Sequence, residues 1–381
     1  MSSVVYLDYN ATTPVLKETI SELVSVMAED FGNPASKTHR FGWKAAERVE
    51  NSRSNMAKLL NCEPGELYFN SGSTEGLNTL IKGFFKAYHS KGRHIISCKT
   101  EHKAVLDSLE YIKNEGAEIS WLGVDRNGQI SLNELKSLLR PETIAVCLML
   151  ANNETGIIHD IKTIASIVHE AGALLVCDAT QAVGKIAVDI YSLGIDAMVF
   201  SGHKFYAMKG VGGMFVKRKN PRVRCLPMLH GGGHENGFRS GSLNVAGIVS
   251  MELSLQKNLE NLESESQRQI ELRQKLESGI KMMGGLVIGE NMLRLPNTTM
   301  VLLPGIKAEK LITQLPFFAF STGSACSSAQ NTPSHVLLAM GYTEEEAYSA
   351  IRISIGRFTL EEDVLSFVTE LRKSYKTIGN Q

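Results

Sequence analysis

The sequence predicts an α/β fold, with a mostly parallel seven-stranded sheet in a large domain and a smaller α+β domain beside it. From Glu66 to Val216, short apolar runs alternate with helical patterns, an order typical of a parallel sheet that helices cover on both faces. After a long helical stretch from 245 to about 283, strands and helices follow without strict alternation, which favours an α+β unit. A chain of 381 residues is long enough for two or three such units.

The individual elements can be predicted in chain order. Before the alternation we expect an extended piece at 4–8, a turn cluster at 10–14, a helix to about 27, a loop at 31–36 and a helix at about 43–60. The seven strands are expected at 67–69, 94–99, 119–124, 144–150, 174–178, 197–203 and 212–216. The helices between them are expected to end near 88 and to lie near 103–115, 131–140 and 160–171. The smaller domain is expected to contain strands at 285–289, 298–304, 317–321 and 350–355, and helices at 307–315, 334–340 and 360–375.

This order of elements places the domain boundaries. We expect the large domain to span 16–255 and to contain every alternating strand and helix. The small domain is expected to combine 1–15 with 256–381 and to carry a polar loop near 321–333. The chain shows no internal repeat and no low-complexity segment.

Charge and cysteine usage exclude several classes of protein. The formal net charge is zero, so no overall field calls for nucleic acid or a membrane surface, and direct nucleic-acid binding is not expected. A local basic run at 217–224 is interpreted as a solvated loop. No signal peptide and no apolar stretch long enough to span a membrane are found. The six cysteines form no Cys-x-x-Cys pair, which predicts a reducing, cytoplasmic location and no metal site.

The most informative stretch is 198–205, where an apolar strand turns abruptly polar at Ser201, His203 and Lys204. Ligands of open α/β sheets bind outside the carboxyl ends of strands. A lysine there, close to the apolar interior, can become a neutral amine and hold an aldehyde as a Schiff base, as enzymes hold pyridoxal phosphate. The alternative is an ordinary strand-end lysine that faces water.

Other expected strands also end in polar clusters. The turn at 71–75 would suit a phosphate at a helix start or serve only as a helix cap. His102 could lie on an aromatic cofactor ring or cap the following helix. Asp178 could pair with a protonated pyridine nitrogen or cap a helix. The cluster 152–156 follows a further strand. Each cluster alone is ambiguous, but together they predict one shared site.

Cys326 lies in a small, polar, glycine-containing stretch at 321–331. We expect its thiol to be exposed and able to act as a nucleophile once deprotonated, whereas Cys147 and Cys177 lie in apolar strands and are expected in the core. The alternative is a tolerated loop cysteine without a chemical role.

With these motifs in order along nearly the whole chain, the sequence resembles the pyridoxal-phosphate-dependent cysteine desulfurases of the class V aminotransferase-like (aspartate aminotransferase-like) fold. It is similar to the subgroup with a long catalytic-cysteine loop, typified by iron–sulfur-assembly desulfurases. The matching segments are 7–14, 32–36, 71–75, 100–103, 152–156, 178–181, 201–204, 230–234, 239–242, 324–326 and 352–357.

The resemblance implies a pyridoxal 5'-phosphate site. Lys204 would hold the cofactor as a Schiff base and later move protons, and His102 would stack on the ring and take part in proton transfer. Asp178 would pair with the ring nitrogen, and Gln181 would contact the phenolic oxygen. The phosphate would be held by Ser73, Thr74, Ser201 and His203. The full set of cofactor-binding residues that the resemblance implies would be Ser73, Thr74, His102, Asn153, Asp178, Gln181, Ser201, His203, Lys204 and Ser242.

The resemblance also implies the reaction. Asn33, Asn153 and Arg352 would hold the carboxylate of the substrate L-cysteine. Cys326 would attack its sulfur, which gives L-alanine and a persulfide on Cys326 that is passed to an acceptor protein. Ser242 would reach the phosphate of the partner subunit's cofactor, which implies a homodimer.

Three departures from the family pattern bear on these expectations. Ala207-Met208 replaces a frequent Gly-Pro, and Ser242 replaces a usual threonine, but neither change removes a catalytic group. The chain ends soon after the helix expected at 360–375, whereas desulfurases that serve an iron–sulfur scaffold often extend further. The acceptor is therefore left open between such a scaffold and proteins for the thio-modification of tRNA or DNA, including DNA phosphorothioation.

Rival functions remain. One is another class V enzyme, an aminotransferase or a selenocysteine lyase-like enzyme, in which Cys326 does not accept sulfur. Another is a non-catalytic sulfur carrier or regulatory scaffold, which the joint presence of Lys204, His102 and Asp178 disfavours. A serine hydrolase is excluded because no Gly-x-Ser-x-Gly occurs, and the absence of Gly-x-x-x-x-Gly-Lys-Ser/Thr disfavours a P-loop NTPase.

Overall fold

The computed structural model describes residues 4–322 and 332–379 of the chain, and its largest feature is a seven-stranded sheet. The strand order is β2-β8-β7-β6-β5-β3-β4. The strands are β2 (Leu67–Asn70), β3 (His94–Cys98), β4 (Glu118–Leu122), β5 (Thr143–Met149), β6 (Leu174–Asp178), β7 (Ala197–Ser201) and β8 (Gly212–Val216). β8 runs antiparallel to both of its neighbours, β2 and β7, and all other neighbouring strands of this sheet are parallel, so the predicted mostly parallel sheet is confirmed.

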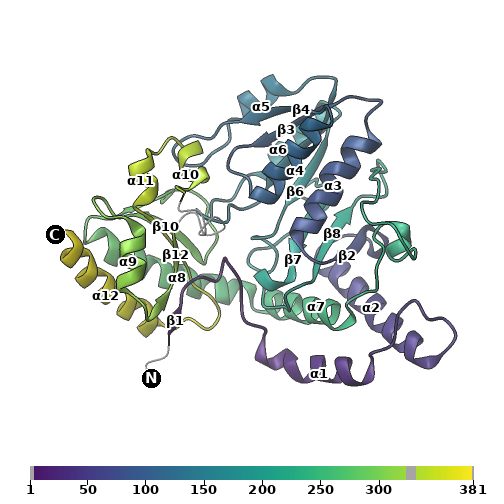
Figure 1. The fold of residues 1–381 in the computed structure, drawn as a ribbon, viewed down its shortest axis with the longest axis horizontal. Helices are drawn as coiled ribbons and strands as arrows, with labels where there is room; N and C mark the ends of the chain where they lie inside the picture. The colour runs from purple at the N-terminus through teal and green to yellow at the C-terminus, as the bar shows by residue number, and fades with distance from the viewer. Residues whose placement is uncertain (1–3, 323–331, 380–381) are drawn as a thin grey trace.

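Helices cover both faces of this sheet because side chains alternate between the faces along each strand. In β5, Cys147 packs into a core with α3 (Ser73–Ala87) and α4 (Lys103–Asn114). The neighbouring Val146 packs into a second core on the opposite face. The helices of this second face are α2 (Arg40–Leu59), α5 (Leu132–Leu138), α6 (Ile161–Glu170) and α7 (Val245–Glu260). α1 (Ile20–Glu29) lies outside α7 at the edge of the molecule (Figure 1).

A second, four-stranded antiparallel sheet lies beside the first, with the order β12-β13-β10-β9 (Figure 1). Its strands are β9 (Leu286–Val287), β10 (Thr298–Leu302), β12 (Ser321–Thr322) and β13 (Ala350–Ser354). Its helices are α8 (Leu262–Lys281), α9 (Ala308–Gln314), α10 (His335–Ala339), α11 (Glu344–Tyr348) and α12 (Glu361–Gly379). The buried Leu7 joins the core of α8, α9 and α12, so both ends of the chain contribute to this unit.

Some predicted elements differ in detail from the observed ones. The single helical stretch expected from 245 to 283 is two helices, because the backbone leaves helical geometry at Asn261 (φ −117°, ψ 15°). The single strand expected at 317–321 is also wrong. Its first part is β11 (Phe318–Ala319), which pairs with β1 (Val5–Tyr6), and the next residues form β12 in the other sheet. The predicted domain boundary at 255/256 lies inside α7, and the division itself stays a prediction.

Among the described residues, four short 3-10 helices complete the elements, and one of them directly follows β7. They are η1 (Lys17–Thr19), η2 (Pro64–Glu66), η3 (Gly202–Lys204) and η4 (Glu235–Gly237). The strand expected at 197–203 therefore ends at Ser201, and a tight turn follows that carries His203 and Lys204. Across the described residues, no helix is both long enough and apolar enough to cross a membrane.

Candidate active site

A cleft of about 450 Å³ opens where β3, β5, β6 and β7 end, as expected for an open α/β sheet. It brings together ten residues that the sequence singled out: Ser73, Thr74, His102, Asn153, Asp178, Gln181, Ser201, His203, Lys204 and Arg352. Nine of these follow or lie at the ends of strands of the large sheet, whereas Arg352 comes from β13 of the small sheet. The cleft therefore lies between the two sheets.

Lys204 lines this cleft, and two backbone carbonyl groups hold its amine. Its Nζ donates to the backbone carbonyl oxygens of Asn10 at 2.7 Å and Ala11 at 2.8 Å. The fully buried Phe200 and Phe205 on either side anchor the turn η3 in the core, and this fixes the direction of the lysine. The sequence alternative of a lysine that faces only water is thus not what the structure shows.

His203 lies beside Lys204 and is neutral at ordinary pH. Its Nδ1 is 3.1 Å from the hydroxyl of Thr12. Burial, together with the nearby lysines Lys204, Lys209 and Lys185, lowers the pKa of His203 to about 4. At pH 7 the imidazole can therefore serve the cleft as a hydrogen-bonding group but adds no positive charge.

A chain of hydrogen bonds links Asp178 to the start of α3. The carboxylate oxygen Oδ1 of Asp178 accepts from the backbone N–H of Thr180 at 2.9 Å and also from the Thr180 hydroxyl. The same hydroxyl lies 2.6 Å from Ser73 Oγ, so it can accept a hydrogen bond from the Ser73 hydroxyl while it donates to Asp178. Asp178 is only 7 % exposed, and these contacts hold the carboxylate at the end of β6. A buried carboxylate held in this way can pair with a cation in the cleft.

The N-terminus of α3 points into the cleft without a side-chain cap. Gly72 occupies the N-cap position with φ 148°, and no side chain accepts from the first turn there. The backbone of β8 passes so close to Gly72 that residue 212 must also be a glycine, because a Cβ on Gly212 would lie 2.6 Å from the Cα of Gly72. Unsatisfied N–H groups at a helix start, together with the hydroxyls of Ser73 and Thr74, suit a phosphate.

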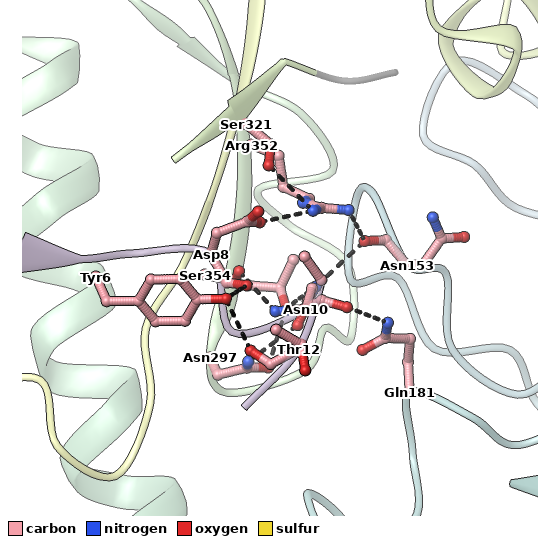
Figure 2. Close-up of polar contacts among 12 residues, drawn as sticks. Tyr6, Asp8, Asn10, Thr12, Asn153, Gln181, Asn297, Ser321, Arg352 and Ser354 are labelled. Atoms are coloured by element: carbon pink, nitrogen blue, oxygen red, sulfur yellow. Dashed lines mark hydrogen bonds and ion pairs between the residues drawn. The ribbon is translucent and has the colours of Figure 1, made fainter. Parts of the chain in front are cut away.

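Arg352 reaches the cleft from the small sheet and is 2 % exposed. Figure 2 shows its guanidinium between Asp8 and Asn153. One guanidinium nitrogen, Nη2, donates to Asp8 Oδ1 at 2.7 Å, and Nη1 donates to the backbone oxygen of Asn153 at 3.1 Å. Its Nε is buried and has no partner among the described residues. The arginine thereby ties the Asn153 loop to the small sheet and presents a positive charge to the cleft.

His102 combines both of its sequence interpretations. It is the N-cap residue of α4, and its Nδ1 accepts from the backbone N–H of Ala104 at 3.1 Å. Its side chain also lines the cleft. Because the helix cap holds Nδ1, the ring has a defined orientation in the cleft.

Three predicted site residues do not meet the others in this cleft. Asn33 and Ser242 line a separate hollow of about 330 Å³ beside α1 and the start of α7. Their predicted contacts, with the substrate carboxylate and with the partner subunit's cofactor, stay predictions. Cys326 lies outside the described residues.

The structure adds residues that sequence reasoning missed. Asn10 and Thr180 line the cleft, and Lys185 lies next to it. The sequence indicates a turn cluster for the segment that carries Asn10, and the same segment belongs to a motif of the family resemblance. Its buried position, with Asn10 1 % exposed, was the missing information.

Two buried carboxyl groups support the loops around His102. Glu101 is fully buried, accepts from the backbone N–H of Met149 at 2.9 Å, and has its pKa raised well above the ordinary value by burial. Glu154, which is 4 % exposed, accepts a hydrogen bond from the hydroxyl of Ser334. Burial raises the pKa of Glu154 from 4.5 to about 7, and this effect outweighs Ser334, Arg352 and His102, which favour its charged form.

This raised pKa predicts a pH-dependent stability. Because the native state keeps a proton on Glu154 that the unfolded chain releases above pH 4.5, the favourable contribution is complete below that pH and is lost as pH rises through about 7. In Glu154→Gln, which does not titrate, this loss of about 3 kcal/mol should be absent. Urea unfolding of both proteins at about pH 5 and pH 8 measures the difference. If the free energy of unfolding changes equally with pH in both proteins, Glu154 is already ionised in the native state at pH 5.

Three comparisons with known proteins agree with this geometry. The sequence profile of the family described as Aminotransferase class-V matches residues 5–367. The chain is 44 % identical over 373 residues to the cysteine desulfurase IscS of Klebsiella pneumoniae subsp. pneumoniae, covering 97 % of this chain and 92 % of that protein.

Solved structures are similar over nearly the same length. A NifS-like protein superposes with a TM-score of 0.91 at 35 % identity, covering 97 % of this chain and 98 % of the other. A structure titled SspA in complex with cysteine superposes with a TM-score of 0.82 at 30 % identity, covering 93 % of this chain and all of the other.

Proposed function

Because the chain belongs to the class V aminotransferase family and is a cysteine desulfurase, we propose that its cleft holds pyridoxal 5'-phosphate on Lys204 and removes the sulfur of L-cysteine. The family depends on this cofactor. The observation that carries the proposal is the convergence of Lys204, Asp178 and the uncapped start of α3 in one cleft. A lysine, a carboxylate and a phosphate-binding helix start are the groups that the aldehyde, the ring nitrogen and the phosphate of this cofactor require.

The described residues fit distinct tasks around the cofactor. When bound, pyridoxal phosphate supplies an electron sink for the carbanion that forms on the substrate. Lys204 would carry the group and move a proton at the substrate Cα. Asp178 would accept a hydrogen bond from the protonated ring nitrogen, and His102 would lie against the ring. Ser73, Thr74, Ser201 and the neutral His203 would hold the phosphate.

Arg352 and Asn153 are proposed to bind the substrate carboxylate. Arg352 lines the cleft, is nearly fully buried, and already orients Asn153 through its backbone oxygen. A guanidinium held in this way pairs strongly with a carboxylate, because little side-chain freedom is lost on binding.

The sulfur transfer is assigned to Cys326 on the family resemblance. The Cys326 thiol would lose its proton and attack the substrate sulfur, so that an S–S bond forms as the C–S bond breaks. The electron pair of the broken bond stays with the substrate carbon, which takes up a proton and leaves as L-alanine. A persulfide then remains on Cys326 for transfer to an acceptor protein.

The proposed function extends to the dimer, its location in the cell and the sulfur acceptor. We propose a homodimer in which Ser242 reaches the partner subunit's cofactor, and the hollow that Ser242 shares with Asn33 supports a role for this face outside the chain's own cleft. A cytoplasmic location fits the five free thiols among the described residues. The acceptor would serve iron–sulfur cluster assembly or the thio-modification of tRNA or DNA.

A persulfide experiment tests this function. The protein loaded with pyridoxal phosphate is incubated with L-cysteine, alkylated and digested, and L-alanine is quantified. We expect one extra sulfur on the Cys326 peptide and an equal amount of alanine. The peptides of Cys62 and Cys98 serve as internal controls, because burial raises the pKa of these thiols to about 12 and about 11. Alanine without sulfur on Cys326 would favour another class V enzyme instead.

A further inference from the structure

Lys185 lies next to the cleft and has no role in the proposed function. It follows β6 by seven residues and directs its amine between two oxygens. Its Nζ lies 2.5 Å from Oε1 of Gln181 and 2.9 Å from Oδ1 of Asn10 and donates to both. Burial, with the cations Lys204 and Arg352, lowers the pKa of Lys185 well below its ordinary value. A neutral amine still has two hydrogens, which is the number of donors that these two oxygens need.

The contact with Lys185 fixes one end of the Gln181 amide, and Asn10 fixes the other. Nε2 of Gln181 donates to the backbone oxygen of Asn10 at 3.0 Å (Figure 2). The same oxygen accepts from Lys204. A flipped amide would place its oxygen against this carbonyl oxygen, and two acceptors cannot bond. The network therefore specifies which end of the amide is NH₂.

This orientation gives the cleft a hydrogen-bond donor. An amide NH₂ has two hydrogens, and Asn10 takes one of them. The other has no acceptor among the described residues, although Gln181 lines the cleft. An anionic oxygen of a ligand is the partner that such a donor selects.

Removal of the Lys185 amine would leave the amide oxygen of Gln181 without a donor in the described part of the chain, whereas the amide oxygen of Asn10 would keep one. Oδ1 of Asn10 keeps a second donor, Nδ2 of Asn297 at 3.1 Å. Oε1 of Gln181 has no other donor within 4–322 and 332–379. Without Lys185 the amide would keep one anchor of two, and its rotamers would become accessible.

We propose that Lys185 is a positioning residue that holds the Gln181 amide so that its NH₂ group donates to an anionic oxygen on the cofactor ring. The inference rests on the proposed function, since it assumes that pyridoxal phosphate binds in the cleft. It extends that function to a residue that acts on the ring only through Gln181.

The test measures binding of pyridoxal phosphate to the apo-protein by absorbance. Lys185→Met has a similar length and no donor, and we expect about tenfold weaker binding and a displaced absorbance maximum. Lys185→Gln, whose shorter side chain cannot reach both oxygens, is measured alongside in case one variant does not fold, and the same loss is expected. Lys162→Met, an exposed position on α6, is the matched control and should bind as the wild type does.

A double-mutant cycle separates positioning from a general structural effect. In the background Gln181→Ala, Lys185→Met should change binding by less than about twofold, because the residue it acts through is gone. An equal tenfold loss in that background would overturn the proposal, and so would unchanged binding and spectrum in Lys185→Met alone. If the wild type binds no pyridoxal phosphate on Lys204, the proposed function fails instead.

Discussion

Lys204→Ala abolishes desulfurase turnover, with an expected loss of at least about a thousandfold. The reason is that Lys204 supplies both the amine that carries the cofactor and a group for proton transfer. Its Nζ is held by hydrogen bonds to the carbonyl oxygens of Asn10 and Ala11, and an alanine side chain has no amine to take this place. The measurement is alanine formation from L-cysteine, combined with borohydride reduction and peptide mapping of the lysine that becomes linked to pyridoxal phosphate.

A second lysine in the cleft makes the mapping informative. Lys209 also lines the cleft, so the linkage must be located and not merely detected. We expect it on Lys204 in the wild type and on no lysine in the variant. Retained secondary structure by circular dichroism, with Lys162→Ala as control, excludes misfolding. A linkage on Lys209 in the wild type would refute the assignment.

Asp178→Asn should still bind pyridoxal phosphate but lose about ten- to a thousandfold in turnover. A nearby carboxylate raises the pKa of a protonated pyridine nitrogen by about one to three units, and a neutral amide does not. Binding should persist because the amide oxygen of asparagine can accept the same hydrogen bonds from Thr180. The phosphate contacts at α3 are also unchanged.

The measurement compares the change in cofactor affinity with the change in kcat. Cofactor affinity from absorbance should change little, while kcat for alanine formation falls. Asp107→Asn, an exposed carboxylate on α4, is a control of the same chemistry and should retain both values. Wild-type turnover in Asp178→Asn would mean that Asp178 has only a structural role, through its hydrogen bonds to Thr180.

The fold and most of the site could be predicted from local sequence patterns. Apolar runs of strand length between helical patterns specify a parallel sheet, and parallel strands bring their carboxyl ends to one edge. Lys204, Asp178, His102 and Asn153 each follow such a run, so their meeting in one cleft follows from the periodicity alone. The family resemblance was needed to assign the roles, and it alone singled out Ser242 and Arg352.

Contacts between segments far apart in the chain could not be predicted in this way. Asn10 is connected to Gln181, Lys185, Lys204 and Asn297 across the large and small sheets, and no local pattern indicates which turn residue will be buried at such a junction. The break at Asn261 was missed for the same reason, since helix ends depend on what the following helix packs against. Local periodicity decides which strands and helices form and which edge carries the polar groups. Long-range packing, which buries Asn10 and brings Arg352 from the second sheet, decides how those groups are held.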